Sequence, residues 1–213
     1  GGHKPLNFVH KLADGSTRHV QTYAGPIEIY GDKLMLCIVH DITEQKRLEE
    51  QLEHAAHHDA MTGLLNRRQF YHITEPGQMQ HLAIAQDYSL LLIDTDRFKH
   101  INDLYGHSKG DEVLCALART LESCARKGDL VFRWGGEEFV LLLPRTPLDT
   151  ALSLAETIRV SVAKVSISGL PRFTVSIGVA HHEGNESIDE LFKHVDDALY
   201  RAKNDGRNRV LAA

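Results

Sequence analysis

Residues 130–143 read LVFRWGGEEFVLLL, and this stretch decides the fold. Two apolar runs flank Gly135 and Gly136, a pattern that predicts two strands joined by a turn. The glycines permit positive φ and let a large ligand approach the backbone closely. Glu137 and Glu138 would face opposite sides of a regular strand, whereas at a distorted turn both can converge on one site.

These two carboxylates stand beside an apolar run, where a charge demands a partner or a cation. Hard oxygen ligands of this kind suit Mg²⁺, which would bridge the phosphates of a nucleotide. The alternative interpretation is an exposed turn with solvated acids.

Around this hairpin, the chain from residue 59 onward alternates predicted helices and strands. A buried strand covers residues 89–94, a further strand covers 173–179, and helices are expected at 109–126, 147–165 and 187–204. This order, with a hairpin at its centre rather than repeated βαβ units, predicts an α+β sandwich. We expect a central, mostly antiparallel sheet flanked by helices.

The first 43 residues have a different pattern. Residues 6–40 are predicted to be β-structure, with a hairpin turn at Asp14-Gly15 and another turn marked by Pro26 and Gly31-Asp32. Residues 44–58 then form a helix with Thr43 as its expected N-cap. Their short apolar stripe fits either a solvated helix packed on its own domain or a parallel coiled coil with a second subunit.

Bulk composition excludes several classes of function. The formal net charge of −5 gives no general attraction to nucleic acid, so no DNA or RNA partner is expected. No apolar run approaches the roughly 18 residues of a membrane span, and no membrane contact is expected. Three scattered cysteines are typical of reduced thiols in a cytoplasmic protein. Because the chain begins without methionine, we expect a piece of a longer protein, whose upstream part could hold sensor or membrane segments.

Acidic side chains also end the strand at 89–94. Asp94 would stand at the carboxyl end of this strand, well placed to hold a metal at the sheet's edge. Asp96 would point the same way if the strand continued. Alone, the pair is a weak signal, because an N-cap for a following helix explains it equally well.

Asn102 and Asp111 form a pair that can together read a guanine base. The carboxylate would accept from the ring N–H and the exocyclic amine, and the amide would meet the remaining edge. Each also has a plain structural explanation, as a turn residue and as an acid in a helix's first turn. His54 and His58 have the spacing of a zinc helix, but no further ligand set accompanies them, so ordinary surface histidines are favoured.

Residues 59–213 resemble the GGDEF family of diguanylate cyclases along the whole length of that domain. Five ordered segments carry the resemblance: 59–68 (DAMTGLLNRR), 94–103 (DTDRFKHIND), 105–111 (YGHSKGD), 133–139 (RWGGEEF) and 197–208 (DALYRAKNDGRN). Glu137 stands where the family name has Asp, a variant found in active members. Met61 replaces the usual Leu.

The resemblance implies a palm-like fold, similar to that of nucleotide cyclases, and an enzyme that condenses two GTP into cyclic di-GMP. It implies that Asp94, the carbonyl of Thr95 and Glu137 hold Mg²⁺, or alternatively Mn²⁺, with Glu138 close by. It assigns catalytic roles to Glu137, Glu138 and Lys99, and Glu137 would accept the proton of the ribose 3′-hydroxyl. The substrate contacts it implies are Asn102 and Asp111 on guanine, with Phe98, Lys99, Lys203 and Arg207 completing the site.

The family also implies assembly and regulation. Each subunit would bind one GTP, so activity would require a homodimer, and the helix at 44–58 would serve that purpose. Arg126 and Asp129 match an inhibitory R-x-x-D site for the product cyclic di-GMP. A second arginine often used there aligns with Thr157, which weakens the match.

Residues 1–43 resemble the second half of a PAS sensor domain, ending in the Asp41-Ile42-Thr43 segment. The first half, which walls the usual ligand pocket, is absent, so no sensor cofactor is expected and an exposed strand edge could pair with another chain. The organisation is therefore predicted as 1–43 partial PAS, 44–58 linker helix and 59–213 catalytic domain. The competing interpretation is an inactive receptor that binds GTP or cyclic di-GMP without turnover.

Overall fold

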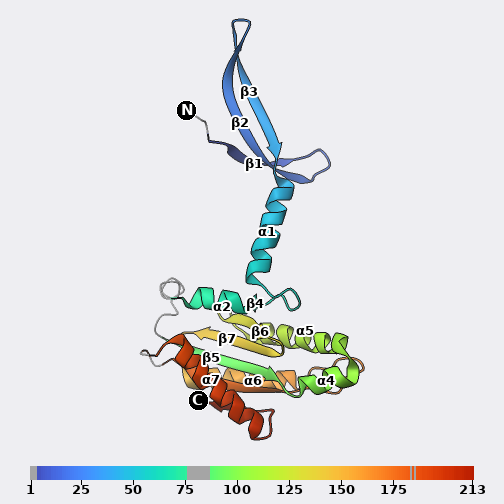
Figure 1. Cartoon of the computed structure of the whole chain (residues 1–213), viewed down its shortest axis with the longest axis vertical. Coiled ribbons are helices and arrows are strands. Elements are labelled where there is room, and N and C mark those ends of the chain that lie inside the picture. The colour runs from blue at the N-terminus through green and yellow to red at the C-terminus, as the bar shows by residue number, and fades with distance from the viewer. Residues whose placement is uncertain (1–3, 76–86, 183, 185) are drawn as a thin grey trace. The chain divides into compact units, whose positions relative to one another are not determined.

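The computed structural model describes residues 4–75, 87–182, 184 and 186–213 of the chain. It divides into two compact units, Gly1–Ala56 and His57–Ala213. Figure 1 labels their elements, and each unit is described by itself.

The first unit contains a three-stranded antiparallel sheet in the order β1-β2-β3. Its strands are β1 (Leu6–Lys11), β2 (Thr17–Ile29) and β3 (Asp32–Asp41). The turn predicted from Pro26 and Gly31-Asp32 lies between Ile29 and Asp32, as the second marker indicated, but Pro26 is no part of it, because it lies inside β2 opposite Met35. β1 pairs with β2 only as far as Thr22, so the missing N–H of Pro26 interrupts no pairing on that side.

Most apolar side chains of this sheet are exposed. Among the described residues of the first unit, the buried hydrophobic side chains are Val20 and Ile42. Phe8, Met35 and Ile38 are each about half exposed or more, at 46%, 66% and 56%. These strands therefore lack a covered face of their own, and their assignment to a partial PAS domain stays a prediction.

Helix α1 (Thr43–His57) follows β3 directly and has no buried residue. The prediction that Thr43 caps it is wrong: Thr43 is its first residue, and the Thr43 Oγ1 accepts a hydrogen bond from the His19 N–H at 2.9 Å. The Asp41 carboxylate accepts a hydrogen bond from the Thr43 N–H at 2.9 Å. This satisfies one of the backbone N–H groups that have no partner within the first turn of the helix. Leu48 and Leu52 stay 47% and 72% exposed. Which partner covers this stripe, if any, stays a prediction.

The second unit is built on a six-stranded mixed sheet in the order β4-β6-β7-β5-β8-β9. The strands are β4 (Leu65–Asn66), β5 (Tyr88–Thr95), β6 (Leu130–Gly135), β7 (Glu138–Pro144), β8 (Val175–His181) and β9 (Val210–Ala212). The central pairs are antiparallel, and the outer pairs β4·β6 and β8·β9 are parallel. The predicted mostly antiparallel sheet is confirmed. β8 begins two residues later than predicted, and the short β4 and β9 were not predicted.

Helices cover both faces of this sheet (Figure 1). They are α2 (Arg67–Thr74), α4 (Phe98–Tyr105), α5 (His107–Cys124), α6 (Leu148–Val162) and α7 (Ile188–Asn204). In β5, Leu91 and Ile93 join the core under α4, α5 and α6, whereas Leu90 and Leu92 join the core under α2 and α7. This alternation explains the continuous apolar run of the strand. The eight-residue helices α2 and α4 were not predicted, since two turns carry too little periodicity.

A glycine brings α7 close to the sheet. A Cβ at Gly178 in β8 would lie 2.2 Å from the Val195 carbonyl oxygen and 2.6 Å from the Leu199 nitrogen. Only glycine permits this contact between the backbones of strand and helix. The approach carries the end of α7, and with it Lys203, toward the end of β5. No helix of the described residues has the length and apolar character needed to cross a membrane.

Candidate active site

The β6–β7 hairpin presents two acids at a distorted turn. Its register shifts between Arg133 and Gly135, and Gly136 has a left-handed φ of 51°. The Arg133 guanidinium donates to both carboxylate oxygens of Asp59, at 3.0 and 3.1 Å, and to the Gly136 carbonyl at 3.0 Å. Through these bonds one half-buried arginine holds the turn against the start of the second unit.

Three carboxylates meet where this turn approaches the end of β5. Asp94, which is 5% exposed, pairs across the sheet with Glu138. Burial raises the pKa of Asp94, although the ammonium of Lys203 opposes this shift. Burial and then the charge of Asp94 raise the pKa of both Glu137 and Glu138. The charge of Asp94 therefore acts on both neighbouring glutamates, and their convergence on one bound ion stays a prediction.

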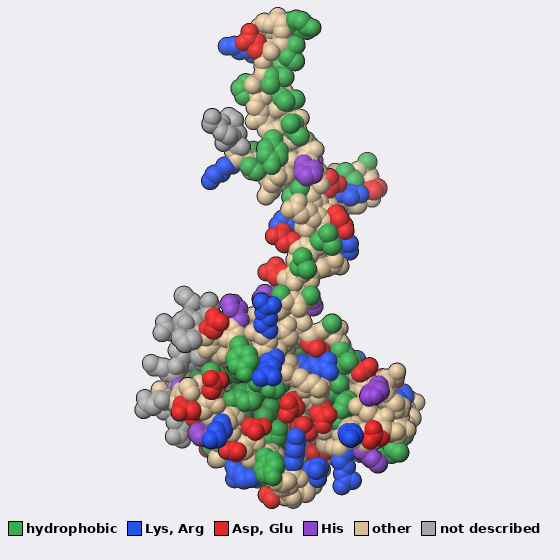
Figure 2. Space-filling model, viewed as in Figure 1, with side chains coloured by type: hydrophobic (Ala, Val, Ile, Leu, Met, Phe, Trp, Pro, Cys, Tyr) green, Lys and Arg blue, Asp and Glu red, His purple; other side chains and the backbone are tan. Residues whose placement is uncertain are grey.

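The charge of this cluster is partly balanced from α7 and the turn after it. Lys203 Nζ forms an ion pair with Asp94 Oδ2 at 2.7 Å. Arg207 lies beyond the helix end, and its charge favours the ionised form of Asp94 and so acts to lower its pKa. Figure 2 shows acidic side chains gathered on the visible face of the second unit with Lys and Arg side chains around them.

The donor set at this cluster fits a hard divalent cation. The groups available are carboxylate and carbonyl oxygens, which suit Mg²⁺ or Mn²⁺. The Thr95 Oγ1 is buried without a hydrogen-bond partner in the described structure, and the Thr95 N–H donates to the Glu137 carbonyl at 3.3 Å. Among described residues, no three His, Cys, Asp or Glu side chains form a ready metal site. Mg²⁺ needs none, because it is usually held by one or two carboxylates together with substrate phosphates.

Asp96 lies within electrostatic range of Asp94, whose pKa its charge raises, but the strand does not continue to it, so the condition set for the predicted alignment is not met. The strand ends at Thr95, and the Asp96 carboxylate turns to accept hydrogen bonds from Thr174 and Ser176, both at 2.6 Å. Helix α4 follows Arg97, whose φ is 56° and which makes no side-chain cap. Asp96 therefore does not cap α4, and its carboxylate is bonded to hydroxyl groups at the start of β8.

The residues predicted to contact guanine lie where α4 meets the start of α5. A Cβ at Gly110 would lie 1.9 Å from Asn102 Oδ1 and 3.1 Å from the ring of Phe98. This places Asn102 directly against the first turn of α5, one residue from the exposed Asp111. Asn102 Oδ1 is buried and has no hydrogen-bond partner in the described part of the chain. Lys99 is exposed on α4 and takes no part in the ion pair at Asp94.

Arg126 and Asp129 also come together, at a cavity of about 370 Å³ between α5 and β6. The Arg126 Nε donates to Asp129 at 3.0 Å, and the same guanidinium donates to the Pro144 carbonyl and to Thr146. The side chain of Arg126 is still 54% exposed. Thr157 is an exposed residue of α6 whose hydroxyl donates to its own helix, at the Ser153 carbonyl.

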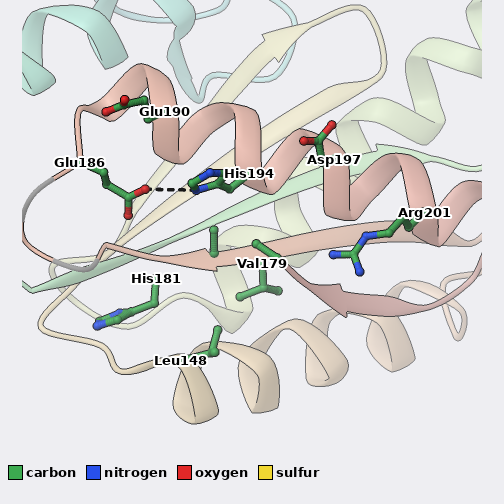
Figure 3. Close-up of a pocket in the computed structure, with 10 residues that line it drawn as sticks. Leu148, Val179, His181, Glu186, Glu190, His194, Asp197 and Arg201 are labelled. Carbon is green, nitrogen blue, oxygen red and sulfur yellow. Dashed lines mark ion pairs between the residues drawn. The ribbon is translucent and has the colours of Figure 1, made fainter.

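A larger cavity, of about 810 Å³, lies apart from all of these residues. It is lined by side chains of β8 and α7 and by the start of α6, including His181, His194 and Arg201 (Figure 3). One wall holds the ion pair between His194 and Glu186, at 3.1 Å. None of the predicted site residues lines this cavity.

With this geometry in place, comparison with known proteins assigns the class. Residues 56–209 match the family described as "Diguanylate cyclase, GGDEF domain", and the chain belongs to that family. It is 99% identical over its whole length to the diguanylate cyclase DgcM of Escherichia coli O157:H7, of which it covers 52%. It is also 39% identical to the diguanylate cyclase VdcA of Vibrio cholerae over 178 residues, covering 79% of the chain and 51% of VdcA. The chain thus spans about half the length of these curated relatives.

Solved structures agree with the fold. The coiled coil and GGDEF domain of DgcB from Caulobacter crescentus, in complex with c-di-GMP, is 32% identical with a TM-score of 0.72. This match covers 80% of the chain and 94% of DgcB's. The active GGEEF domain of a diguanylate cyclase from Vibrio cholerae is 38% identical with a TM-score of 0.64, covering 70% and 97% of the two chains. The predicted family and palm-like fold are confirmed.

Two structural roles were missed from sequence. The pairing of Arg133 with Asp59 joins residues 74 positions apart, and the opposite charges of two short motifs were its sole signal. The bonds from Asp96 reach 78 and 80 residues along the chain, to hydroxyls that no pattern marked.

The raised pKa of Glu138 predicts a gain in stability when its charge is removed. Glu138 ionises less readily in the folded protein than in the unfolded chain. Its ionisation therefore lowers the free energy of unfolding as the pH rises from the ordinary pKa of glutamate through the raised pKa of Glu138. In metal-free buffer at about pH 7.5, we expect Glu138→Gln to raise the midpoint of thermal unfolding by about 1–2 °C, a shift kept small by partial exposure.

The same comparison at about pH 3, where the carboxyl is largely protonated in both states, should show a smaller difference. The exposed Glu122→Gln is the control and should change little at either pH. A lower midpoint for Glu138→Gln at neutral pH would contradict the electrostatic assignment.

Proposed function

We propose that this chain condenses two GTP molecules into cyclic di-GMP and releases two pyrophosphates. The observation that carries the proposal is the group of Asp94, Glu137 and Glu138 beside Lys203, in a domain of the diguanylate cyclase family. Buried carboxylates with raised pKa values, next to a cation, are typical of a site that binds a metal and phosphates.

Asp94, the Thr95 carbonyl and Glu137 would hold Mg²⁺, or Mn²⁺ in its place, with Glu138 close by. A bound divalent ion would polarise the α-phosphate and stabilise the negative charge of the leaving pyrophosphate. Lys203, now paired with Asp94, would then be available to the triphosphate, together with Arg207 and Lys99. The ion pair in the structure supports this, because a cation at Asp94 would compete with Lys203 for the same carboxylate.

Glu137 would accept the proton of the attacking ribose 3′-hydroxyl. Its raised pKa, caused by burial and by Asp94, makes its carboxylate a stronger base than that of an exposed glutamate. Glu138 would help Glu137 and Asp94 to balance the charge of the ion, and Lys99 would stabilise the transferring phosphate.

Asn102 and Asp111 would read the guanine base, with Phe98 forming the floor beneath Asn102. The buried Asn102 Oδ1 lacks a partner in the described structure, and a donor of the base would remove the cost of leaving it unpaired. An adenine would present the opposite pattern to Asp111, so GTP is the proposed substrate.

Two copies of the chain would be needed for one turnover. One subunit holds one nucleotide, whose 3′-hydroxyl must attack the α-phosphorus of a nucleotide in the other. The exposed stripe of Leu48 and Leu52 on α1 supports a helix pair that would bring two subunits together. The strands of residues 1–43, as a partial PAS domain without a sensor cofactor, would add contacts through their apolar faces and edges.

The product would bind at Arg126 and Asp129 and inhibit the enzyme. The cavity of about 370 Å³ supports this site. The contacts of Arg126 with Pro144 and Thr146 would have to open, because a guanidinium used on protein carbonyls has fewer donors for a ligand. Thr157 supplies no second arginine, so affinity would depend mainly on Arg126.

Removing Glu137 tests the proposed enzyme directly. We expect Glu137→Ala to lower the rate of cyclic di-GMP formation from GTP at least about 100-fold, because it removes both a metal ligand and the base. Turnover is measured by pyrophosphate release and chromatography of the product. Sedimentation should show an unchanged oligomeric state.

Asp149→Ala, an exposed change on α6, is the control for this test and should keep full activity. If a confirmed wild-type dimer bound GTP and formed no product, the chain would be an inactive receptor, which is the competing function. Normal turnover by Glu137→Ala would also contradict the proposed site.

A single methyl group tests the guanine contact. Gly110→Ala would place a Cβ on the present position of Asn102 Oδ1 and push the amide aside. Alanine favours the helix by about 1 kcal/mol over glycine, so thermal stability should be kept while KM for GTP rises about 10-fold or more.

Ser108→Ala is the matched control, because this exposed position lies in the same turn of α5. It raises helix propensity in the same way, and an unchanged KM is expected. An unchanged KM in Gly110→Ala as well would remove Asn102 from the substrate contacts.

The inhibitory site predicts a loss of product inhibition without a loss of chemistry. In Arg126→Ala, the initial rate should match that of wild type, and progress curves should stay linear at concentrations of cyclic di-GMP that stop the wild-type enzyme. Truncating an arginine that binds a ligand's phosphates costs about 2–4 kcal/mol, so the inhibition constant should rise about 30-fold or more. Lys127→Ala, next to it in the same loop, should retain inhibition. An unchanged inhibition constant in Arg126→Ala would count against the site.

A further inference from the structure

The turn that follows α7 has an unusual backbone. Gly206, Arg207 and Asn208 have consecutive positive φ angles of 111°, 64° and 46°. Glycine adopts such values freely, but for Arg207 and Asn208 each costs about 1 kcal/mol or more. Two strained residues in succession persist only where other contacts hold them.

Part of what holds them is a hydrogen bond to the side chain of Asp96, the residue that follows β5. The Asn208 N–H donates to Asp96 Oδ2 at 3.0 Å. The same oxygen accepts from Thr174 and the other oxygen accepts from Ser176, each at 2.6 Å. With the Asp96 N–H bonded to the Thr174 carbonyl at 2.9 Å, the side chain is 7% exposed and fixed by its neighbours.

These bonds tie three segments of the second unit together. Asp96 follows β5, Thr174 and Ser176 lie just before and within the start of β8, and Asn208 lies between α7 and β9. The backbone on either side of the turn is held too, by Arg207 N–H on the Ala202 carbonyl at 3.0 Å and Ile177 N–H on the Arg209 carbonyl at 2.9 Å. The Asp96 bond therefore acts on the middle of the turn, directly after Arg207.

The position of Arg207 matters for the acid cluster. Arg207 follows α7 four residues after Lys203, whose Nζ is 2.7 Å from Asp94 Oδ2, so the turn carries Arg207 past the same end of the helix. In the proposed function Arg207 contacts the triphosphate. The side chain of Arg207 is long and flexible, and its backbone is strained. If this backbone became ordered only when the triphosphate bound, the entropy lost would lower the affinity, so a backbone that is already held favours binding.

We infer that Asp96 is a positioning residue for the triphosphate: its carboxylate holds the Arg207–Asn208 turn in the left-handed conformation that aims Arg207 at the acid cluster. This rests on the proposed function for the identity of the ligand. It differs from a metal role, which Asp94 two residues earlier would have, although both are acids of one Asp-x-Asp motif.

Asparagine separates the two roles. In Asp96→Asn the amide oxygen still accepts from the Asn208 N–H, and the amide nitrogen can donate to the Ser176 hydroxyl. The turn should stay in place, whereas asparagine at a metal ligand weakens a site that needs the negative charge. We expect Asp96→Asn to keep nucleotide affinity within about 3-fold of wild type, and the matched control Asp94→Asn to lose about 10-fold or more.

Alanine tests the coupling to Arg207. The probe is a GTP analogue with a methylene group between the α- and β-phosphorus, titrated calorimetrically with Mg²⁺ into the full chain. Asp96→Ala and Arg207→Ala should each lower affinity about 10-fold, and the double variant should lose no more than about 2-fold beyond either. Should Asp96→Ala not fold, Asp96→Ser, which is too short to reach Asn208, takes its place.

The inference is overturned if Asp96→Asn loses as much affinity as Asp94→Asn, or if the losses from Asp96→Ala and Arg207→Ala are additive. The analogue releases no pyrophosphate, so the titration measures the effect of Asp96 on binding even if the wild-type chain turns over no GTP. Absence of turnover would contradict only the proposed function. Turnover by wild type without the coupling would defeat only the role of Asp96.

Discussion

Three carboxylates share one half-buried place at the end of β5 and the β6–β7 turn, and the rest of the second unit is arranged to tolerate them. Burial disfavours the charge of Asp94, Glu137 and Glu138, as their raised pKa values show. Lys203 offsets part of that cost from the end of α7. Lys203 reaches the cluster because Gly178 lets α7 lie directly on β8. The packing of this helix thereby places a positive charge beside the acids.

The same cluster explains why nearby loops are held so firmly. The hairpin turn, which carries two of the acids, is bonded to Arg133 and through it to Asp59. The turn after α7 is bonded to Asp96. A site that must bring phosphates and a cation together gains affinity when its groups are placed before the ligand arrives. Burial of the three carboxylates lowers the stability of the fold. The hydrogen bonds of Arg133 and Asp96 hold the two turns beside them in one conformation.

The two units differ in how complete they are. The second buries apolar residues on both faces of its sheet, whereas Phe8, Met35 and Ile38 of the first stay exposed. A sheet of three strands gains stability when a face is covered, and the first unit leaves its apolar residues without that cover. The proposed chemistry has the same property, since one chain supplies one half of the reacting pair.

Sequence alone determined the family, the mixed sheet and the identity of the acids at the hairpin, because these depend on local motifs and on the period of apolar residues. The short helices α2 and α4 were not predicted, because two turns show too little apolar periodicity. Pro26 suggested a turn, but it lies in a strand, where the edge that β1 leaves unpaired tolerates its missing N–H. Only the tertiary structure decided which side chains far apart in the chain contact one another and which role each has. It separated Asp94 from Asp96 within one motif, because β5 ends between them and the second acid meets hydroxyls about 80 residues away. It also joined Arg133 to Asp59, an interaction that depends on which segments the fold places side by side.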